Sequence, residues 1–297
     1  MRTPPPLIAG DKIGITATAR KISPEELHAF EKWLAERGYE TVYSKHLFAQ
    51  SHQFAGSDQE RAEAFEALWN DHEVKAIWCA RGGYGTARML PLISKHLTEA
   101  RKWIIGFSDV TALLQSLNNQ GVMGLHASMP LEIDKKTNES VAETFRLFEG
   151  GKMCYAWASH PLNQRGEADG ILAGGNLSVI YSLRGTPYDL NPEGKILFLE
   201  DLDEYLYHMD RMAQNLSLSD WWNRLSGVMI GGMTDMKDNA TAFGKTAEEI
   251  IASHTKNVKI PVAFGFSAGH LSHNLPLKMG ATVRLTVNEN ESKLEEM

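Results

Sequence analysis

Short apolar runs alternate with amphipathic segments along the first half of the chain, and this alternation limits the possible folds more than any other feature. Apolar runs of strand length lie at 13–17, 74–79 and 103–106. Before the second of these runs, Ser57 and Glu60 have the spacing of a capping box, which predicts the start of a helix. Strands that alternate with helices indicate a parallel sheet covered by helices. We therefore predict an α/β fold with a parallel sheet in the first half.

Further elements of the same kind continue along this half. Ser23 and Glu26 form a second capping box, which predicts a helix that ends at Gly38. A helix is also expected over 109–117, followed by a strand over 122–126. With these elements the first half can supply about five parallel strands.

The sequence changes in character after Gly150 and Gly151. The segment that follows lacks clear periodicity and contains turn residues, so we place the domain linker within 150–170. Further on, the expected strands are less regular and the helices fewer. A chain of 297 residues also favours two domains by its length. We expect an N-terminal α/β domain over 1–155 and a smaller β-rich domain over 165–297, with the ligand site in the cleft between them.

Charge and hydrophobicity exclude several classes of partner. The formal net charge of -7 gives no cationic surface for nucleic acid, so a small molecule or a peptide is the expected partner. No run approaches the roughly 18 apolar residues of a membrane span, and the N-terminus lacks a signal-peptide stretch, which favours a cytoplasmic protein. Cys79 and Cys154 lack the spacing of a zinc site, and their apolar neighbours predict two buried, reduced thiols.

Ser108 lies where an apolar strand is followed directly by a helix, in WIIGFSDVTALL. Such a turn exposes the serine hydroxyl, and the N–H of Asp109 lies at a helix N-terminus, where it can stabilise an oxyanion. A plain helix cap explains the same two residues, because serine and aspartate are common cap residues. The pattern G-x-S-x-G occurs instead around Ser267, but loop residues follow it rather than a helix. We therefore favour Ser108 over Ser267 as a nucleophile.

A serine nucleophile needs a base, and the base needs a carboxylate that fixes its tautomer. His270 lies in a glycine-containing loop just after an expected strand, a common position for catalytic groups. Glu200 ends the strand ILFLE and is the first of four acidic residues, although a solvated acidic turn explains this run equally well. His270 and His273 are three apart, but no helix aligns them, so we expect no metal site.

The RGGYG sequence after the strand at 74–79 is a candidate for backbone donors. Adjacent glycines allow a backbone to approach a ligand closely, which makes Gly82 and Gly83 candidates for a second oxyanion donor. A dinucleotide-binding loop is disfavoured, because the spacing is not G-x-G-x-x-G.

Taken together, these segments resemble the LD-carboxypeptidases, serine peptidases also called muramoyltetrapeptide carboxypeptidases. The segments that match, in chain order, are GDKIGITATA, RGGYG, GFSDVT, GGNLS, FLED, DRM and GH. The resemblance implies a nucleophile at Ser108, an acidic partner at Glu200 and a base at His270. It also implies that the oxyanion donors are the backbone of Asp109 and of Gly82 or Gly83.

The same resemblance implies a Rossmann-like N-terminal domain, a smaller β-rich C-terminal domain, a homodimer, and no metal or organic cofactor. The implied reaction releases the terminal D-alanine from cell-wall tetrapeptides in peptidoglycan recycling. The candidate substrate-binding residues in the matching segments and beside them are Arg81, Tyr84, His126 and Asn176. Arg88 and Arg184 are further candidates for the substrate carboxylate.

Two other functions stay open at this point. A hydrolase of peptide-nucleotide or aminoacyl-nucleotide conjugates, of the microcin-immunity type, would keep the three catalytic residues and change the pocket. A non-catalytic protein in which two lobes close on a sugar or peptide would share the charge and the two-domain layout.

Overall fold

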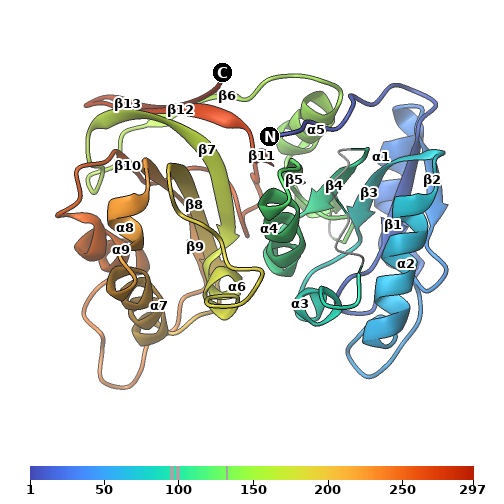
Figure 1. Ribbon diagram of the computed structural model, residues 1–297, viewed down its shortest axis with the longest axis horizontal. Helices are drawn as coiled ribbons and strands as arrows, with labels where there is room; N and C mark the ends of the chain where they lie inside the picture. The colour runs from blue at the N-terminus through green and yellow to red at the C-terminus, as the bar shows by residue number, and fades with distance from the viewer. Residues whose placement is uncertain (94–96, 98–100, 132) are drawn as a thin grey trace. The chain divides into compact units, whose positions relative to one another are not determined.

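The computed structural model describes residues 1–93, 97, 101–131 and 133–297 (Figure 1). The chain forms two compact units. The first contains Met1–Gly151 together with Ser272–Gly280, and the second contains Lys152–Leu271 together with Ala281–Met297. The segment Ser272–Gly280 thus returns to the first unit after most of the second has been formed.

The first unit is built on a six-stranded sheet with the order β11-β5-β4-β3-β1-β2. Five strands are parallel, as the sequence predicts, and β11 pairs antiparallel with β5. The strands are β1 (Lys12–Thr16), β2 (Glu40–Tyr43), β3 (Val74–Cys79), β4 (Trp103–Gly106), β5 (Gly124–His126) and β11 (Leu277–Met279). The predicted Rossmann-like N-terminal fold is therefore confirmed.

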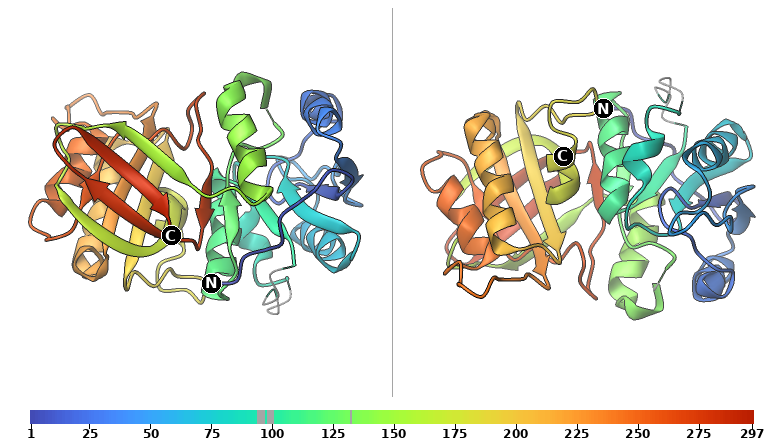
Figure 2. Two further views of the ribbon diagram at one scale, coloured as in Figure 1. Left: turned by 90° about the horizontal axis from the view of Figure 1, so that it is seen from above. Right: turned by 90° about the horizontal axis from the view of Figure 1, so that it is seen from below.

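Helices cover both faces of this sheet, with α1 and α5 on one face and α2 and α4 on the other (Figure 2). The helices of the first unit are α1 (His28–Glu36), α2 (Asp58–Asn70), α3 (Thr86–Met89), α4 (Thr111–Asn119) and α5 (Asn138–Phe148). Short 3-10 turns lie at Glu25–Leu27, Ser108–Val110 and Ile133–Lys135. The capping box of Ser57 and Glu60 forms as predicted at the start of α2. At Ser23 and Glu26 only the Glu26 carboxylate takes part, by accepting the Ser23 N–H, and the α-helix begins at His28.

Aromatic packing fixes α1 and α5 to the sheet. Trp78 of β3 is fully buried, and its ring meets Phe30 of α1 edge-on at a centroid distance of 4.6 Å. Phe145 and Phe148 of α5 contact the same ring, each at 5.9 Å. Burial of one such side chain contributes about 1.5–3 kcal/mol, so this cluster is a main source of stability in the first unit.

The second unit contains a seven-stranded sheet with the order β10-β9-β8-β7-β12-β13-β6. Its strands are β6 (Cys154–Ala158), β7 (Gly166–Asn176), β8 (Lys195–Leu202), β9 (Gly227–Thr234), β10 (Val262–Ala263), β12 (Thr282–Val287) and β13 (Glu291–Glu296). Strands β7 to β10 are parallel, whereas β12, β13 and β6 form antiparallel pairs. The expected β-rich character of this domain is confirmed.

Four helices pack against the parallel strands of this sheet and enclose its apolar core. They are α6 (Leu177–Ser182), α7 (Leu206–Leu218), α8 (Trp221–Arg224) and α9 (Ala247–Thr255). No helix among the described residues combines the length and the apolar character that crossing a membrane requires.

The prediction of two buried thiols is wrong for Cys154. Cys79 is buried, but Cys154 is exposed at the start of β6. Strand β6 lies at the edge of its sheet, and its side chains alternate between the covered and the open face, so Cys154 points outward while Tyr155 is buried. Its apolar neighbour Tyr155 lies on the covered face instead.

Candidate active site

Ser108 lies in a tight and strained turn between β4 and α4. Its φ angle is +61°, a left-handed conformation that costs a non-glycine residue about 1–2 kcal/mol. A Cβ atom at Gly106 would lie 2.9 Å from a methyl group of Val110, so the helix starts directly over the end of the strand. Strained residues of this kind concentrate at active sites.

The segment around Ser267 has no such geometry. It lies in an irregular stretch between β10 and β11, and no helix follows it before β11 begins. Of the two serines, only Ser108 lies in a strand-to-helix turn, and its role as a nucleophile stays a prediction.

The glycine loop of RGGYG passes directly beside Ser108. A Cβ atom at Gly82 would lie 3.2 Å from Ser108 Cβ and 3.3 Å from Ser108 Oγ, closer than ordinary side-chain contacts. Gly83 has a φ angle of +107°, which side chains rarely adopt. The first unit thus brings together Ser108, Asp109, Gly82 and Gly83, the residues predicted to hold the nucleophile and the oxyanion donors.

Glu200 and His270 form a close pair in the second unit. The distance from His270 Nδ1 to Glu200 Oε2 is 2.7 Å, and since a carboxylate can only accept, Nδ1–H is the donor. The Glu200 side chain, two residues before the end of β8, is 0% exposed, whereas that of His270 is 17% exposed. A hydrogen bond at Nδ1 leaves Nε2 as the basic nitrogen, which is the tautomer that a general base requires.

A glycine allows the histidine loop to reach this carboxylate. Gly269 has a φ angle of +109°, and a Cβ atom there would lie 2.7 Å from Glu200 Oε2. The loop is also tied to β9, because the N–H of Gly232 donates to the carbonyl of Ala268 at 2.9 Å. The position of His270 is therefore set by the close packing of Gly269 on Glu200 and by the hydrogen bond between Ala268 and β9.

The acidic run that begins at Glu200 is a solvated turn only in its later part. Asp203 is exposed and pairs with Lys237, but Glu200 and Asp201 are buried. Asp201 accepts from Asn176 Nδ2 at 2.9 Å and from the N–H of Ser178 at 2.8 Å. Burial, and then the charge of Glu200, raise the pKa of Asp201 to about 7. Sequence reasoning missed this buried second acid, since adjacent residues of a strand normally face opposite sides.

The four candidate substrate-binding residues have different surroundings. Asn176 caps α6, with its Oδ1 accepting from Val179 N at 3.1 Å. His126 is buried at the end of β5 and stacks on the Phe107 ring at 5.6 Å. In the glycine loop, Arg81 donates to the carbonyl of Lys21 at 2.8 Å, and Tyr84 is half exposed. Arg81, Tyr84 and His126 belong to the first unit and Asn176 to the second.

Arg88 and Arg184 are paired with acids of their own. Arg88 binds Asp58 at 2.8 Å, and Arg184 binds Asp189 at 3.1 Å while its guanidinium lies over the Trp221 ring. Both contacts are typical of structural arginines. Within the described part of the chain, no three or more His, Cys, Asp and Glu side chains form a group that could hold a metal ion.

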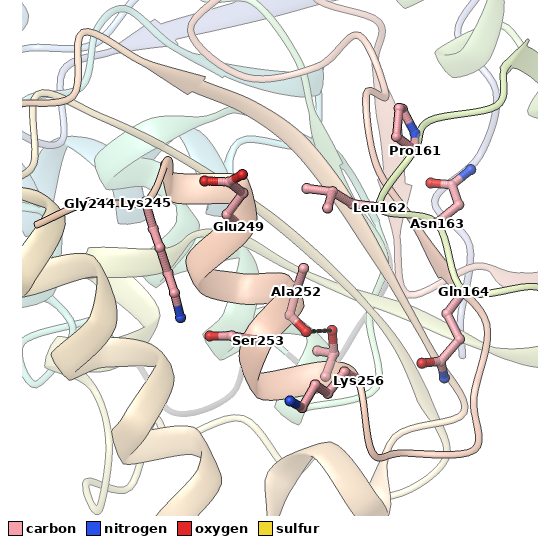
Figure 3. A pocket seen from close by; sticks show the side chains of 11 residues that line it. Pro161, Leu162, Asn163, Gln164, Gly244, Lys245, Glu249, Ala252, Ser253 and Lys256 are labelled. Carbon is pink, nitrogen blue, oxygen red and sulfur yellow. Dashed lines mark hydrogen bonds between the residues drawn. The ribbon is translucent and has the colours of Figure 1, made fainter.

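Three of the cavities in the second unit lie against α9, and none of these three is lined by a predicted site residue. One has a volume of about 560 Å³ and lies between α9 and the segment Pro161–Gln164 (Figure 3). Another, of about 280 Å³, is lined by Ser217 and His254 among others. Ser217 Oγ lies 2.9 Å from His254 Nδ1, and His254 Nε2 lies 3.0 Å from Asp210 Oδ1.

This second Ser-His-Asp chain lacks the features of a nucleophile site. Ser217 lies in the last turn of the regular helix α7, and its Oγ also accepts from Trp222 Nε1 at 3.0 Å and reaches the carbonyl of Ala213 at 3.2 Å. Such contacts are those of a structural serine. The chain still provides a matched control for experiments on Ser108.

Comparison with known proteins agrees with the motifs in the sequence. Residues 13–127 match the LD-carboxypeptidase N-terminal domain, and residues 169–285 match the LD-carboxypeptidase C-terminal domain. A probable murein peptide carboxypeptidase of Bacillus subtilis (strain 168) is 30% identical over 303 residues, which covers 98% of this chain and 94% of that protein.

Solved structures show the same fold. A muramoyltetrapeptide carboxypeptidase from Oxalobacter formigenes superimposes with a TM-score of 0.88 at 24% identity, covering 96% of this chain and 98% of the other. The microcin C7 self immunity protein MccF, in complex with aspartyl sulfamoyl adenosine, gives a TM-score of 0.85 at 20% identity, covering 100% and 99%. With both domains matched in order, the chain belongs to the LD-carboxypeptidase family of serine peptidases.

Proposed function

We propose that this protein is a serine LD-carboxypeptidase that releases the terminal D-alanine from murein tetrapeptides during peptidoglycan recycling. The observation that carries the proposal is the strained turn at Ser108, with the backbone of Gly82 packed against its side chain. The pair of His270 and Glu200 supplies an oriented base in the same chain. The relatives named as murein peptide and muramoyltetrapeptide carboxypeptidases support the substrate class.

In the proposed reaction, His270 Nε2 removes the proton of the Ser108 hydroxyl as Oγ attacks the carbonyl carbon before the terminal D-residue. The carbonyl oxygen becomes an oxyanion, which the N–H of Asp109 and of Gly82 or Gly83 stabilise. Each such donor lowers the barrier by about 3–4 kcal/mol. The imidazolium of His270, held by Glu200, then protonates the amine of D-alanine, and the C–N bond breaks.

The second half of the cycle hydrolyses the acyl-enzyme. Water attacks the ester carbonyl while His270 accepts its proton, and the shortened tripeptide leaves as Ser108 is reprotonated. The peptide ends in a carboxylate, and we propose that Arg81, Tyr84, His126 and Asn176 contact the substrate. The reaction needs no metal or organic cofactor.

The direct test is incubation with a muramoyl tetrapeptide, followed by mass spectrometry. The wild-type protein should release D-alanine and tripeptide, and Ser108→Ala should lose at least about 10⁴-fold in turnover. Ser267→Ala is the matched control, because it removes the serine of the G-x-S-x-G pattern, and it should keep its turnover. Near-normal activity of Ser108→Ala would refute the proposal.

A fluorophosphonate probe separates the enzyme from a binding protein. Labelling should occur at Ser108 and persist in Ser217→Ala, the variant that breaks the second Ser-His-Asp chain. A folded protein that takes up no label would favour the two-lobed binding protein. Turnover of an aminoacyl-nucleotide conjugate without release of D-alanine from the tetrapeptide would favour the microcin-immunity type of hydrolase.

The proposal includes a homodimer in the cytoplasm, where recycled murein peptides are degraded. It is supported by the membership of the chain in its family. Light scattering during size-exclusion chromatography should give twice the mass of one 33.1 kDa chain, and fractionation of cells should recover the protein with the cytoplasmic enzymes.

A further inference from the structure

The carboxylate of Asp109, the residue directly after the nucleophile, faces the glycine loop. The residue is only 5% exposed, and its Oδ2 accepts the backbone N–H of Thr86 at 2.8 Å. Thr86 is the first residue of α3 and immediately follows the RGGYG sequence. The residue whose N–H is a proposed oxyanion donor thus also binds, through its side chain, the end of the glycine loop.

Several groups of the loop bind this carboxylate together. Burial raises the pKa of Asp109, and hydrogen bonds from the backbone and side chain of Thr86 and from the backbone of Gly85 act against that rise. The positive charge of Arg61 also lowers the pKa of Asp109. A buried acid that accepts a backbone N–H holds the segment that carries it.

Arg61 binds the carbonyl side of the same segment. This α2 side chain is 1% exposed and pairs with Asp58. It donates to the carbonyls of Gly56 at 2.8 Å, Thr18 at 3.1 Å and, more weakly, Gly85 at 3.4 Å. Asp109 and Arg61 therefore bind neighbouring residues of one segment, the carboxylate at the N–H of Thr86 and the guanidinium at the carbonyl of Gly85. A hydrogen bond of 2.9 Å between the hydroxyls of Thr18 and Thr86 closes the network.

The glycine loop needs such external contacts because glycines restrict the backbone little by themselves. Gly83 and Gly85 have φ angles of +107° and +146°, and glycines lose more conformational entropy than other residues when they become ordered. Backbone donors lower a barrier only if they are already in place when the charge develops. A shift of about 1 Å can cost 10²-fold in rate.

We propose that Asp109 and Arg61 are positioning residues, which hold residues 82–85 against Ser108 so that a loop N–H can stabilise the oxyanion. The expected effect of these residues on the rate rests on the proposed function. Neither of the two side chains touches the substrate in this proposal. The contacts that carry it all lie within the first unit.

The main test is Asp109→Asn, which keeps the size of the side chain but replaces one acceptor oxygen by an N–H₂ group. We expect kcat to fall by about 10- to 100-fold. KM, and the Kd for the tetrapeptide measured in a Ser108→Ala background, should change by less than about threefold, because ground-state binding does not use the oxyanion donors. Thr86→Val removes only the hydroxyl contacts and should lower kcat by about three- to tenfold with the fold intact.

Leu68→Ala is the control for lost stability. Leu68 is buried in α2, the helix that also carries Arg61, and packs on β1 at Gly14 without entering the hydrogen-bond network. It should lower the melting temperature and leave kcat unchanged. If kcat falls as far in Leu68→Ala as in Asp109→Asn, the effect belongs to stability and the positioning role is wrong.

The rate of labelling of Ser108 by a fluorophosphonate distinguishes this inference from the proposed substrate. Labelling also develops negative charge on an oxygen beside the oxyanion donors, and it needs no peptide. Slow labelling of Asp109→Asn, combined with a wild-type protein that leaves the tetrapeptide intact, would support the positioning role and reject the substrate. Normal kcat and normal labelling in folded Asp109→Asn and Thr86→Val would overturn the positioning role while leaving the carboxypeptidase intact.

Discussion

Replacement of Glu200 by glutamine should lower activity and raise stability at the same time. The carboxylate is fully buried near the C-terminal end of β8, and its Oε2 accepts from His270 Nδ1 at 2.7 Å. Its second oxygen, Oε1, is also buried and has no hydrogen-bond partner among the residues that the structure describes. Glutamine has nearly the same shape, so Glu200→Gln removes the charge without opening a cavity.

The two effects have opposite signs because the charge is needed only during the reaction. In the proposed cycle the carboxylate fixes the tautomer of His270 and stabilises the imidazolium, and loss of this function lowers kcat by about 10⁴-fold in triads of this kind. In the resting protein, a buried carboxylate with one unpaired oxygen is destabilising, and a neutral amide should recover about 1–3 kcal/mol.

The neighbouring acid makes the gain depend on pH. The charge of Glu200 contributes to the raised pKa of Asp201, which is about 7. Above that pH both carboxylates are charged and repel each other, whereas below it Asp201 is protonated. The stabilisation by Glu200→Gln should therefore be larger at pH 8 than at pH 5.5.

Urea denaturation at the two pH values and steady-state kinetics on the tetrapeptide measure both effects. Asp210→Asn is the matched control, because Asp210 also contacts an imidazole, His254, at 3.0 Å in the same unit. It should leave kcat unchanged. A Glu200→Gln protein that keeps its wild-type kcat, or one that loses both stability and activity in proportion, would refute the assignment of Glu200 as the acid of the triad.

Three further predictions follow from contacts described above. Gly82→Ala should lower kcat by about 10- to 100-fold with little change in melting temperature, because its Cβ would press on Ser108 Oγ from 3.3 Å in a backbone conformation that alanine can adopt; wild-type kinetics would contradict it. The pKa of Asp201 rises from an ordinary 3.8 to about 7 on folding, so the folded state binds the proton more tightly than the unfolded state. The free energy of unfolding should therefore fall by up to about 4 kcal/mol through this group as the pH rises from 4 to 8. Urea denaturation should show a weaker pH dependence in Asp201→Asn than in the wild type. Gly124→Ala should destabilise the protein by about 1–3 kcal/mol in urea denaturation, because its Cβ would lie 2.5 Å from Leu114 Cδ2; an unchanged midpoint would show that α4 can shift away from β5.

Local signals in the sequence predicted the elements that local interactions determine. The capping box of Ser57 and Glu60 forms as expected, because both hydrogen bonds join residues three positions apart. The apolar run at 74–79 becomes β3 with the same bounds. The strand-to-helix turn at Ser108 was also visible, since strand and helix signals meet there without a linker.

Features that depend on distant contacts could not be found in this way. The exposure of Cys154 follows from the edge position of β6, which its neighbours in the sequence do not reveal. The buried state of Asp201 depends on Asn176 and Ser178, some 25 residues away. Arg61 looks like an ordinary charge on an amphipathic helix, and only the tertiary fold brings the carbonyls of Thr18 and Gly85 to its guanidinium.

The return of Ser272–Gly280 to the first unit means that neither unit is one continuous stretch of sequence. A fragment that ends at Gly151 would lack β11 and leave one edge of β5 unpaired. An unpaired edge strand favours pairing between molecules and therefore aggregation. Recombination at the apparent boundary would separate β5 from its partner strand. Because these nine residues complete the sheet of the first unit from within the sequence of the second, the two units have to be expressed as one chain.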